Sequence, residues 1–151
     1  MAMYEHILIS SDGSEAAQAG VDHGLTLAKK HGSKVTAVTV TEPLGGQFAF
    51  ASELWAPSET EIAAFDESQA RIAQRILEPI RRKAEALGIP IETVHIPWRL
   101  VAGALCEISE QKGCSLIVMS SHGRTGMNRV MLGSQTAEVV AKAKVPVLVV
   151  R

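Results

Sequence analysis

The segment Ser115–Val140, SLIVMSSHGRTGMNRVMLGSQTAEVV, decides how the rest of the chain is interpreted. It opens with an apolar run, passes through a loop that contains glycine, and resumes at Gly133-Ser134 ahead of a helical pattern. A strand, a loop and a helix start in this order present backbone N–H groups and the positive end of a helix to an anion. The segment therefore predicts a binding site for a phosphate-bearing ligand.

Outward from this segment, five short runs have the composition of strands, and helix-length segments separate them. Strands that alternate with helices indicate βαβ units, and right-handed crossovers place the helices on both faces of the sheet. Nearly continuous apolar runs, as in three of the five, suit a parallel sheet covered on both faces. We therefore expect one α/β domain over residues 1–151, with a doubly wound five-stranded parallel sheet. The predicted strands are 6–10, 35–40, 91–96, 115–120 and 145–150.

The segments between the strands predict helices over 14–31, 58–87, 100–112 and 134–143. Ser14 and Ser134 are good caps for the first and last of them. Pro79 lies inside the second pattern and predicts a kink or a split into two helices. The apolar stripe expected to be buried along this second helix is Ile62, Phe65, Ala73, Ile76, Ile80, Ala84 and Leu87.

Residues 42–57 precede that helix and contain two prolines, a Gly-Gly pair and aromatic side chains. Because the aromatic side chains need a surface to pack on, we expect an excursion that packs on the domain, not a linker.

The bulk composition excludes several kinds of partner. The net charge of −1 leaves no basic surplus for nucleic acid, and the apolar runs are much shorter than a membrane span. The chain start lacks the pattern of a signal peptide. Cys106 and Cys114 form neither a zinc pattern nor a disulfide framework. We expect a cytoplasmic protein with no nucleic-acid or membrane partner and no metal-ligand cluster of its own.

Ligands of doubly wound sheets bind beyond the carboxyl ends of the strands. If the first and fourth strands are neighbours, Asp12, Gly123, Gly133 and Ser134 converge on one crevice there. Each of them also has a plainer role: Asp12 suits a turn, the glycines shape loops, and Ser134 caps a helix. His122 and the arginines of the same loop are candidate phosphate contacts or ordinary surface residues.

Several enzyme classes lack their motifs in this chain. The nucleotide P-loop, the dinucleotide fingerprint after the first strand and the serine-hydrolase elbow are all absent from the sequence. No residue is placed as an evident general base with an orienting partner, so we expect any hydrolysis to be slow or absent.

The start ILISSDGSEAA, the end LIVMSSHGRTG…LGSQTAEVVAKAKVPVLVV and the five-strand layout resemble the universal stress protein family. The resemblance implies the strand order 3-2-1-4-5, a Rossmann-like sheet of the adenine nucleotide alpha hydrolase type, and a homodimer. The last strand, VPVLVV, would then lie at the sheet edge, where an apolar strand invites pairing with a second chain.

One branch of that family binds ATP through the motif Gly-x2-Gly-x9-Gly-Ser/Thr. Ser120 stands at the first glycine, so a side chain is added where backbone approaches the ligand. A second departure is Arg99-Leu100-Val101, where many members have Gly-Asp-Pro. The family's aspartate corresponds to Asp12, which would hold ribose or a cation bound to the nucleotide. The implied nucleotide-binding residues are Ser11, Asp12, Val40, Ser120, His122, Gly123, Arg124, Gly133, Ser134 and Gln135.

The resemblance implies an ATP-binding stress protein, with or without Mg²⁺, that works as a nucleotide-responsive signalling module. Two alternatives stay open. The serine at position 120 favours a nucleotide-free dimeric interaction protein of the same family. A slow ATPase is the other alternative.

Overall fold

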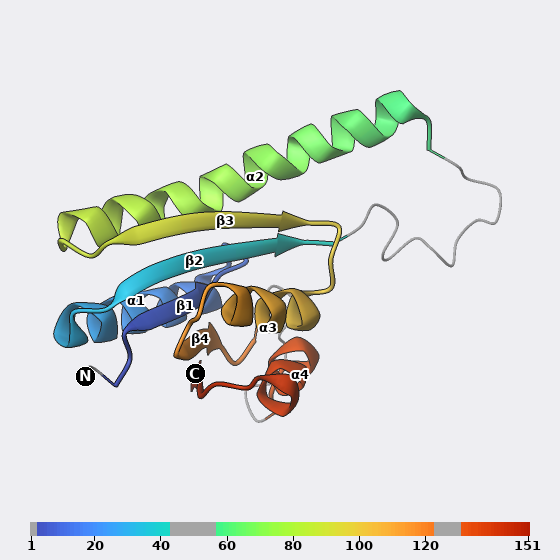
Figure 1. The fold of residues 1–151 in the computed structure, drawn as a ribbon. Coiled ribbons are helices and arrows are strands. Elements are labelled where there is room, and N and C mark those ends of the chain that lie inside the picture. Colours follow the sequence, from blue (N-terminus) through green and yellow to red (C-terminus); the bar gives the residue numbers. More distant parts are fainter. Residues whose placement is uncertain (1–2, 43–56, 123–130) are drawn as a thin grey trace.

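The computed structural model of the chain describes residues 3–42, 57–122 and 131–151. Within them the strands form a five-stranded parallel sheet with the order β3-β2-β1-β4-β5 (Figure 1). The fold class and the strand order expected from the sequence are confirmed, whereas a single domain over residues 1–151 stays a prediction. The strands are β1 (His6–Ser10), β2 (Lys34–Thr41), β3 (Ile91–Pro97), β4 (Leu116–Ser120) and β5 (Val147–Val150).

β5 begins two residues later than the sequence pattern suggests. Pro146 has no N–H to give to the ladder, although its carbonyl still accepts a hydrogen bond of 3.0 Å from the Ile117 N–H. The regular strand therefore starts after the proline.

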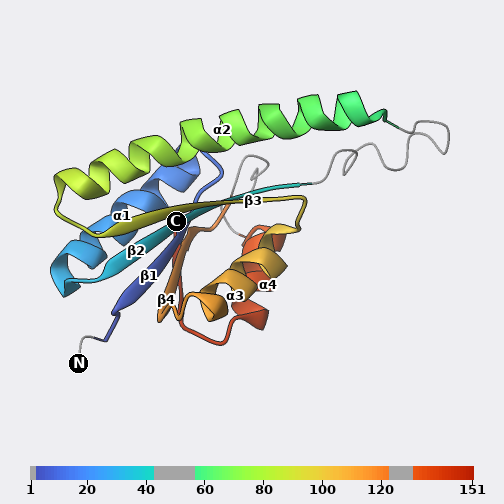
Figure 2. The same ribbon diagram turned by 45° about the horizontal axis from the view of Figure 1, so that its top comes forward.

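Four helices in the described part of the chain cover the two faces of the sheet. α1 and α2 pack on one face, and α3 and α4 pack on the other (Figure 2). The alternation along β1 shows the two layers: Ile7 and Ile9 contact the core under α1 and α2, while Leu8 contacts the opposite core. The helices are α1 (Glu15–His31), α2 (Glu59–Ala86), α3 (Val101–Gln111) and α4 (Ser134–Lys142).

The ends of α1 follow from local chemistry. The Ser14 hydroxyl accepts a hydrogen bond of 3.1 Å from the Ala17 N–H, which is the predicted N-cap. Gly32 ends the helix in the left-handed region, with φ of 68°, where a residue without Cβ is favoured. The expected start and end of this helix are confirmed.

α2 runs unbroken through Pro79, so the predicted split into two helices is wrong. Buried residues lie on both sides of the proline, including Leu77 and Ile80, and they hold the two halves of the helix on one core. The proline itself is exposed, so its ring meets solvent instead of the sheet. Tertiary packing therefore outweighs the loss of one backbone hydrogen bond.

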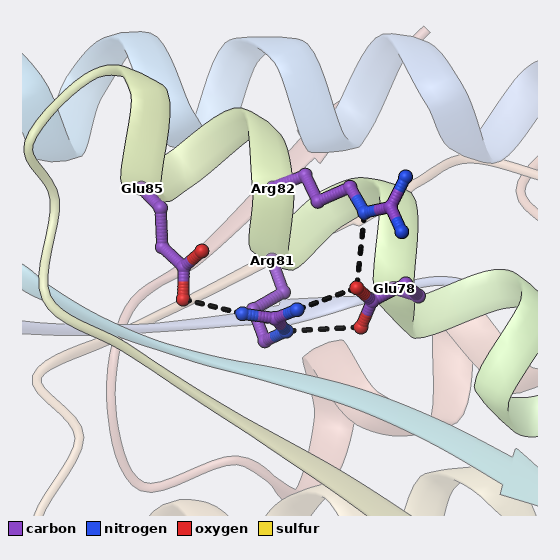
Figure 3. A network of polar contacts seen from close by, with 4 residues as sticks. All are labelled: Glu78, Arg81, Arg82 and Glu85. Atoms are coloured by element: carbon purple, nitrogen blue, oxygen red, sulfur yellow. Dashed lines mark hydrogen bonds and ion pairs between the residues drawn. The ribbon is translucent and has the colours of Figure 1, made fainter.

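A charged network that begins at Glu78, just before the proline, covers the outer side of α2. Arg81 lies between Glu78 and Glu85, and Arg82 also contacts Glu78 (Figure 3). Hydrogen bonds from Arg81, and then from Arg82, lower the pKa of Glu78 to about 2. Pairs three and four residues apart support an exposed helix surface in this way.

The buried stripe predicted for α2 needs correction at both ends. Leu87 is 38% exposed because it lies past the last helical residue, and Leu77 is buried instead. Ile62, Phe65 and Ile76 are only partly buried. The amino-terminal half of α2 extends beyond the carboxyl ends of β2 and β3 (Figure 1), so less of the sheet lies beneath it.

Candidate functional site

A cavity of about 440 Å³ lies at the carboxyl ends of β1, β2 and β4, with α2 on one side and the start of α4 on another. This is the place where doubly wound sheets bind their ligands. The residues that line it are Ser10, Ser11, Asp12, Ala17, Thr39, Val40, Thr41, Glu42, Gln69, Ile72, Ile76, Val101, Met119, Ser120, Gly133, Ser134, Gln135 and Thr136.

The loop after β1 supplies Ser11 and Asp12. The Ser11 hydroxyl accepts a hydrogen bond of 3.1 Å from the Gly13 N–H, and Asp12 Oδ1 accepts one of 2.9 Å from the Ser14 N–H. Gly13 takes a φ of 78°, which a side chain would disfavour. Asp12 therefore has the turn role that the sequence allowed, and it also lines the cavity.

The loop after β4 returns to the cavity at Gly133. The Gly133 N–H donates to the Ser121 carbonyl at 2.8 Å, and a Cβ added at Gly133 would lie 3.1 Å from that same oxygen. Glycine is favoured at this position, because a side chain would push the Ser121 carbonyl away by a few tenths of an ångström.

The cap of α4 lies one residue earlier than its sequence suggests. Gly133 is its N-cap and makes no side-chain cap hydrogen bond, so the predicted cap at Ser134 is wrong. The tight contact between Gly133 and Ser121 sets the helix start, and Ser134 becomes the first helical residue. The amino-terminal end of α4, with its partial positive charge, thus borders the cavity through Gly133, Ser134 and Gln135.

Ser120 is accommodated without backbone strain. Its hydroxyl donates to the His122 carbonyl at 2.6 Å, and its own carbonyl accepts from the Thr136 hydroxyl at 3.1 Å. Among the described residues, Trp98 is the only non-glycine with a positive φ, so this serine does not require the backbone freedom of glycine. The turn itself satisfies the added hydroxyl.

Three further residues of the loop after β4 are predicted from the sequence to bind the nucleotide. His122 does not line the cavity, and its Nδ1 lies 3.1 Å from the Ser121 hydroxyl. Gly123 and Arg124 lie outside the described residues. The other predicted residues, Ser11, Asp12, Val40, Ser120, Gly133, Ser134 and Gln135, all line the cavity.

The sequence analysis missed the wall that α2 contributes. Gln69, Ile72 and Ile76 line the cavity from this helix, opposite Thr39 and Thr41 of β2. Their spacing of three and four residues places them on one face of α2, which is the signal that points to them. Which part of that face meets the cavity depends on where the helix crosses the sheet, and the sequence does not state this.

Two contacts hold the rim of the cavity. Gln135 Oε1 accepts a hydrogen bond of 3.1 Å from the Ala102 N–H, which joins the start of α4 to the start of α3. Thr41 Oγ1 lies 2.8 Å from His95 Nε2, and burial lowers the pKa of this histidine.

The second departure from the family pattern lies at the start of α3. Arg99 pairs with Glu107 at 2.5 Å and does not line the cavity, whereas Val101 does. The neighbouring Trp98 donates its indole N–H to Asp66 of α2 at 2.6 Å. Arg99 therefore supplies no charge to the cavity, and the turn that precedes α3 is fastened to α2.

The model of the universal stress protein family matches residues 3–151. The chain belongs to the universal stress protein family. Universal stress protein MJ0531 of Methanocaldococcus jannaschii is 30% identical over 151 residues, which cover 99% of this chain and 83% of that relative. The resemblance inferred from the two ends of the sequence is thereby confirmed.

Solved structures of universal stress proteins share the fold. The structure of MJ0577, from the same archaeon, superposes with a TM-score of 0.82 at 26% identity, covering 98% of this chain and 96% of that one. A universal stress protein in complex with cAMP has a TM-score of 0.66 at 22% identity, covering 98% of each chain.

Two searches of the described residues bear on other partners. They contain no group of three or more His, Cys, Asp or Glu side chains able to hold a metal ion. No helix among them has the length and apolar character to cross a membrane.

Proposed function

We propose that this universal stress protein binds ATP in the cavity and works as a nucleotide-responsive stress or signalling module. The observation that carries the proposal is the position of the α4 amino-terminus. Its backbone N–H groups at Ser134 and Gln135 border a cavity that also reaches an apolar wall on α2. Helix amino-termini bind phosphate, and apolar walls suit a flat base.

The proposed contacts follow the layout of the cavity. Ser134 provides N–H and hydroxyl donors to the phosphates, and Ser11, Ser120, Gly133 and Gln135 border them. The backbone of Val40 borders the adenine. His122, Gly123 and Arg124 belong to the same proposed phosphate loop. The family member solved with cAMP supports an adenine nucleotide as the ligand class.

Asp12 has two compatible roles in this proposal. One carboxylate oxygen is already held by the Ser14 N–H, which fixes the side chain at the cavity wall. A carboxylate so placed accepts hydrogen bonds from ribose hydroxyls or helps to hold a Mg²⁺ that arrives with the phosphates. Magnesium would then be bound mainly through the nucleotide.

The state of Ser120 favours nucleotide binding over the nucleotide-free alternative. A serine at the first motif position would oppose binding if its hydroxyl needed a partner from the cavity or if its backbone were strained. Its hydroxyl instead donates to the His122 carbonyl, at 2.6 Å. The departure from the motif is therefore absorbed within the loop.

Binding without turnover is the expected behaviour. Among the described residues that line the cavity, the ionisable side chains are the carboxylates Asp12 and Glu42, and no histidine, lysine or cysteine accompanies them. The Ser14 N–H holds Asp12 in the turn, so this carboxylate is not aimed as a general base. If steady ATP hydrolysis occurs and disappears in Asp12→Ala, the protein is a slow ATPase instead. Product formation over hours, measured beside ATP binding, separates the two.

Equilibrium binding of ATP to nucleotide-stripped protein tests the proposal. We expect saturable binding that weakens at least about tenfold in Gly133→Ala, because the new methyl group crowds the Ser121 carbonyl and shifts the loop. Gly103→Ala is the matched control, since nothing lies within 4 Å of a Cβ there. Absence of saturable binding up to millimolar ATP would exclude ATP as the ligand.

We further propose a cytoplasmic homodimer that pairs through β5. This strand lies at the edge of the sheet, and its four residues Val147–Val150 are all only partly buried. An apolar edge strand with unpaired backbone groups is a natural surface for a second copy. Sedimentation that gives a monomer at micromolar concentration would contradict this assembly.

A further inference from the structure

The cavity has a second polar region, away from the α4 amino-terminus, that the family motif does not describe. It lies between β2 and α2, where Thr39 and Gln69 line the cavity together with Ile72 and Ile76. β1 separates β2 from β4 in the sheet, so this region lies across β1 from the proposed phosphate loop.

Thr39 of β2 is the polar residue that faces this region from the sheet. The residue is 1% exposed and lines the cavity, and no hydrogen bond joins its hydroxyl to another described residue. No side-chain oxygen or nitrogen among the described residues is both sealed from solvent and unpaired, so this hydroxyl opens onto the cavity. The next buried threonine of the strand, Thr36, shows the ordinary pattern, because its hydroxyl lies 2.8 Å from His6 Nε2. A hydroxyl that opens onto a cavity without a protein partner is placed to hydrogen-bond a ligand that enters there.

Gln69 offers the complementary group from the opposite wall. Its side chain lines the cavity, and its amide also has no hydrogen-bond partner within the described part of the chain. A glutamine amide carries both a donor and an acceptor, which matches the paired donor and acceptor on the edge of adenine.

The two isoleucines complete the arrangement. Ile72 and Ile76 are three and seven residues beyond Gln69, so all three lie on the same face of α2. An apolar surface with one amide beside it and a hydroxyl across from it suits a flat ring with polar groups on its edge.

We propose that Gln69 and Thr39 read the edge of the nucleotide base, with the Gln69 amide contacting the exocyclic amino group of adenine. This inference rests on the proposed nucleotide function and assigns base recognition to side chains of α2 and β2. Because a side chain reads the base, its replacement changes selectivity between bases as well as affinity.

The test compares ATP with purine ribonucleoside triphosphate, which lacks the exocyclic amino group. Gln69→Leu is expected to weaken binding of ATP about tenfold more than binding of the purine analogue, because ATP loses the hydrogen bonds to both its amino group and a ring nitrogen and the analogue loses only the second. Thr39→Val provides the same comparison from the other wall. Gln74→Leu, on the exposed side of the same helix, is the matched control and leaves both affinities unchanged.

The outcomes separate cleanly. If Gln69→Leu weakens binding of both nucleotides equally, the residue only packs against the base. If ATP binding does not change, the residue makes no contact with the nucleotide. Either result overturns the base-reading role while the nucleotide function stands. If the wild-type protein binds neither nucleotide saturably, the proposed function itself fails and the inference falls with it.

Discussion

Replacement of Thr39 by valine is expected to stabilise the unliganded protein. Valine has the shape of threonine and suits a β-strand, so the substitution removes the hydroxyl without opening a space. In the unliganded fold the residue is 1% exposed, and its hydroxyl opens onto the cavity without a hydrogen bond to another described residue. A group kept for ligand binding costs stability when the ligand is absent.

The cost of burying an unpaired hydroxyl is the upper limit of the effect, because the Thr39 hydroxyl opens onto the cavity. Measurements on proteins place this cost at about 1–3 kcal/mol. Thr39 lines a cavity of about 440 Å³, which water can enter, so we expect the lower end. A gain of about 1 kcal/mol raises the melting temperature of a chain of this size by about 2–4 °C.

Thr36→Val is the matched control, because it makes the same change in the same strand at a paired hydroxyl. Thr36 is 0% exposed and its hydroxyl lies 2.8 Å from His6 Nε2. Its removal leaves the histidine nitrogen without that partner in a buried site, at a cost of about 1–3 kcal/mol. The two threonines should therefore shift stability in opposite directions.

Thermal unfolding of the wild type and both variants, with and without ATP, measures the effect. A ligand that binds only the folded state raises the melting temperature in proportion to the logarithm of its concentration over Kd. Thr39→Val should melt higher alone but gain less from ATP. If it melts as far below the wild type as Thr36→Val does, the hydroxyl has a partner and the reasoning from the cavity is wrong.

Three further predictions concern the rest of the molecule. Pro79→Ala restores an N–H for the Arg75 carbonyl within α2 and should raise the free energy of unfolding in urea by about 1–2 kcal/mol; a loss would mean that the proline is needed for packing. Burial is the main cause that lowers the pKa of His6 below 6.5, so the unfolded chain binds more protons than the folded one. This part of the stability is full above about pH 6.5 and falls as the pH drops below it, and urea titrations from pH 7.5 to 5 should give a shallower slope in His6→Gln than in the exposed-site control His23→Gln. Burial raises the pKa of the Cys114 thiol to about 11, so iodoacetamide at pH 8 should label it much faster in urea than in the native protein; rapid native labelling would contradict its burial.

The sequence predicted the sheet well because each strand is marked locally. The continuous apolar runs around Ile7 and Ile117 are typical of strands buried on both faces, and both residues are 0% exposed. The ends of α1 were predictable for the same reason, because Ser14 and Gly32 act on neighbouring residues.

The errors came from features that depend on distant parts of the chain. Pro79 does not split α2, because the core beneath both halves outweighs the local preference. Ser134 is not a cap, because the position of Gly133 is fixed by the Ser121 carbonyl across the loop.

The residues of the candidate site also fall into two groups: those that the local sequence marks and those that depend on distant packing. Asp12 and Gly133 follow strands in the sequence, so their place at the carboxyl edge of the sheet was predictable. Gln69 reaches the cavity only because α2 crosses the sheet at a particular height, and a polar residue in a helix otherwise indicates a surface position. Long-range packing is the information that a local pattern lacks.

The contact between Trp98 and α2 gives the protein an intrinsic optical reporter. The Trp98 ring meets Phe65 edge to face, with ring centroids 6.0 Å apart, while its N–H donates to Asp66. Gln69 lies one helical turn beyond Asp66, so a ligand that moves this part of α2 also changes the surroundings of the indole. The chain has two tryptophans, and a Trp55→Phe protein would leave the fluorescence of Trp98 alone to follow a nucleotide titration.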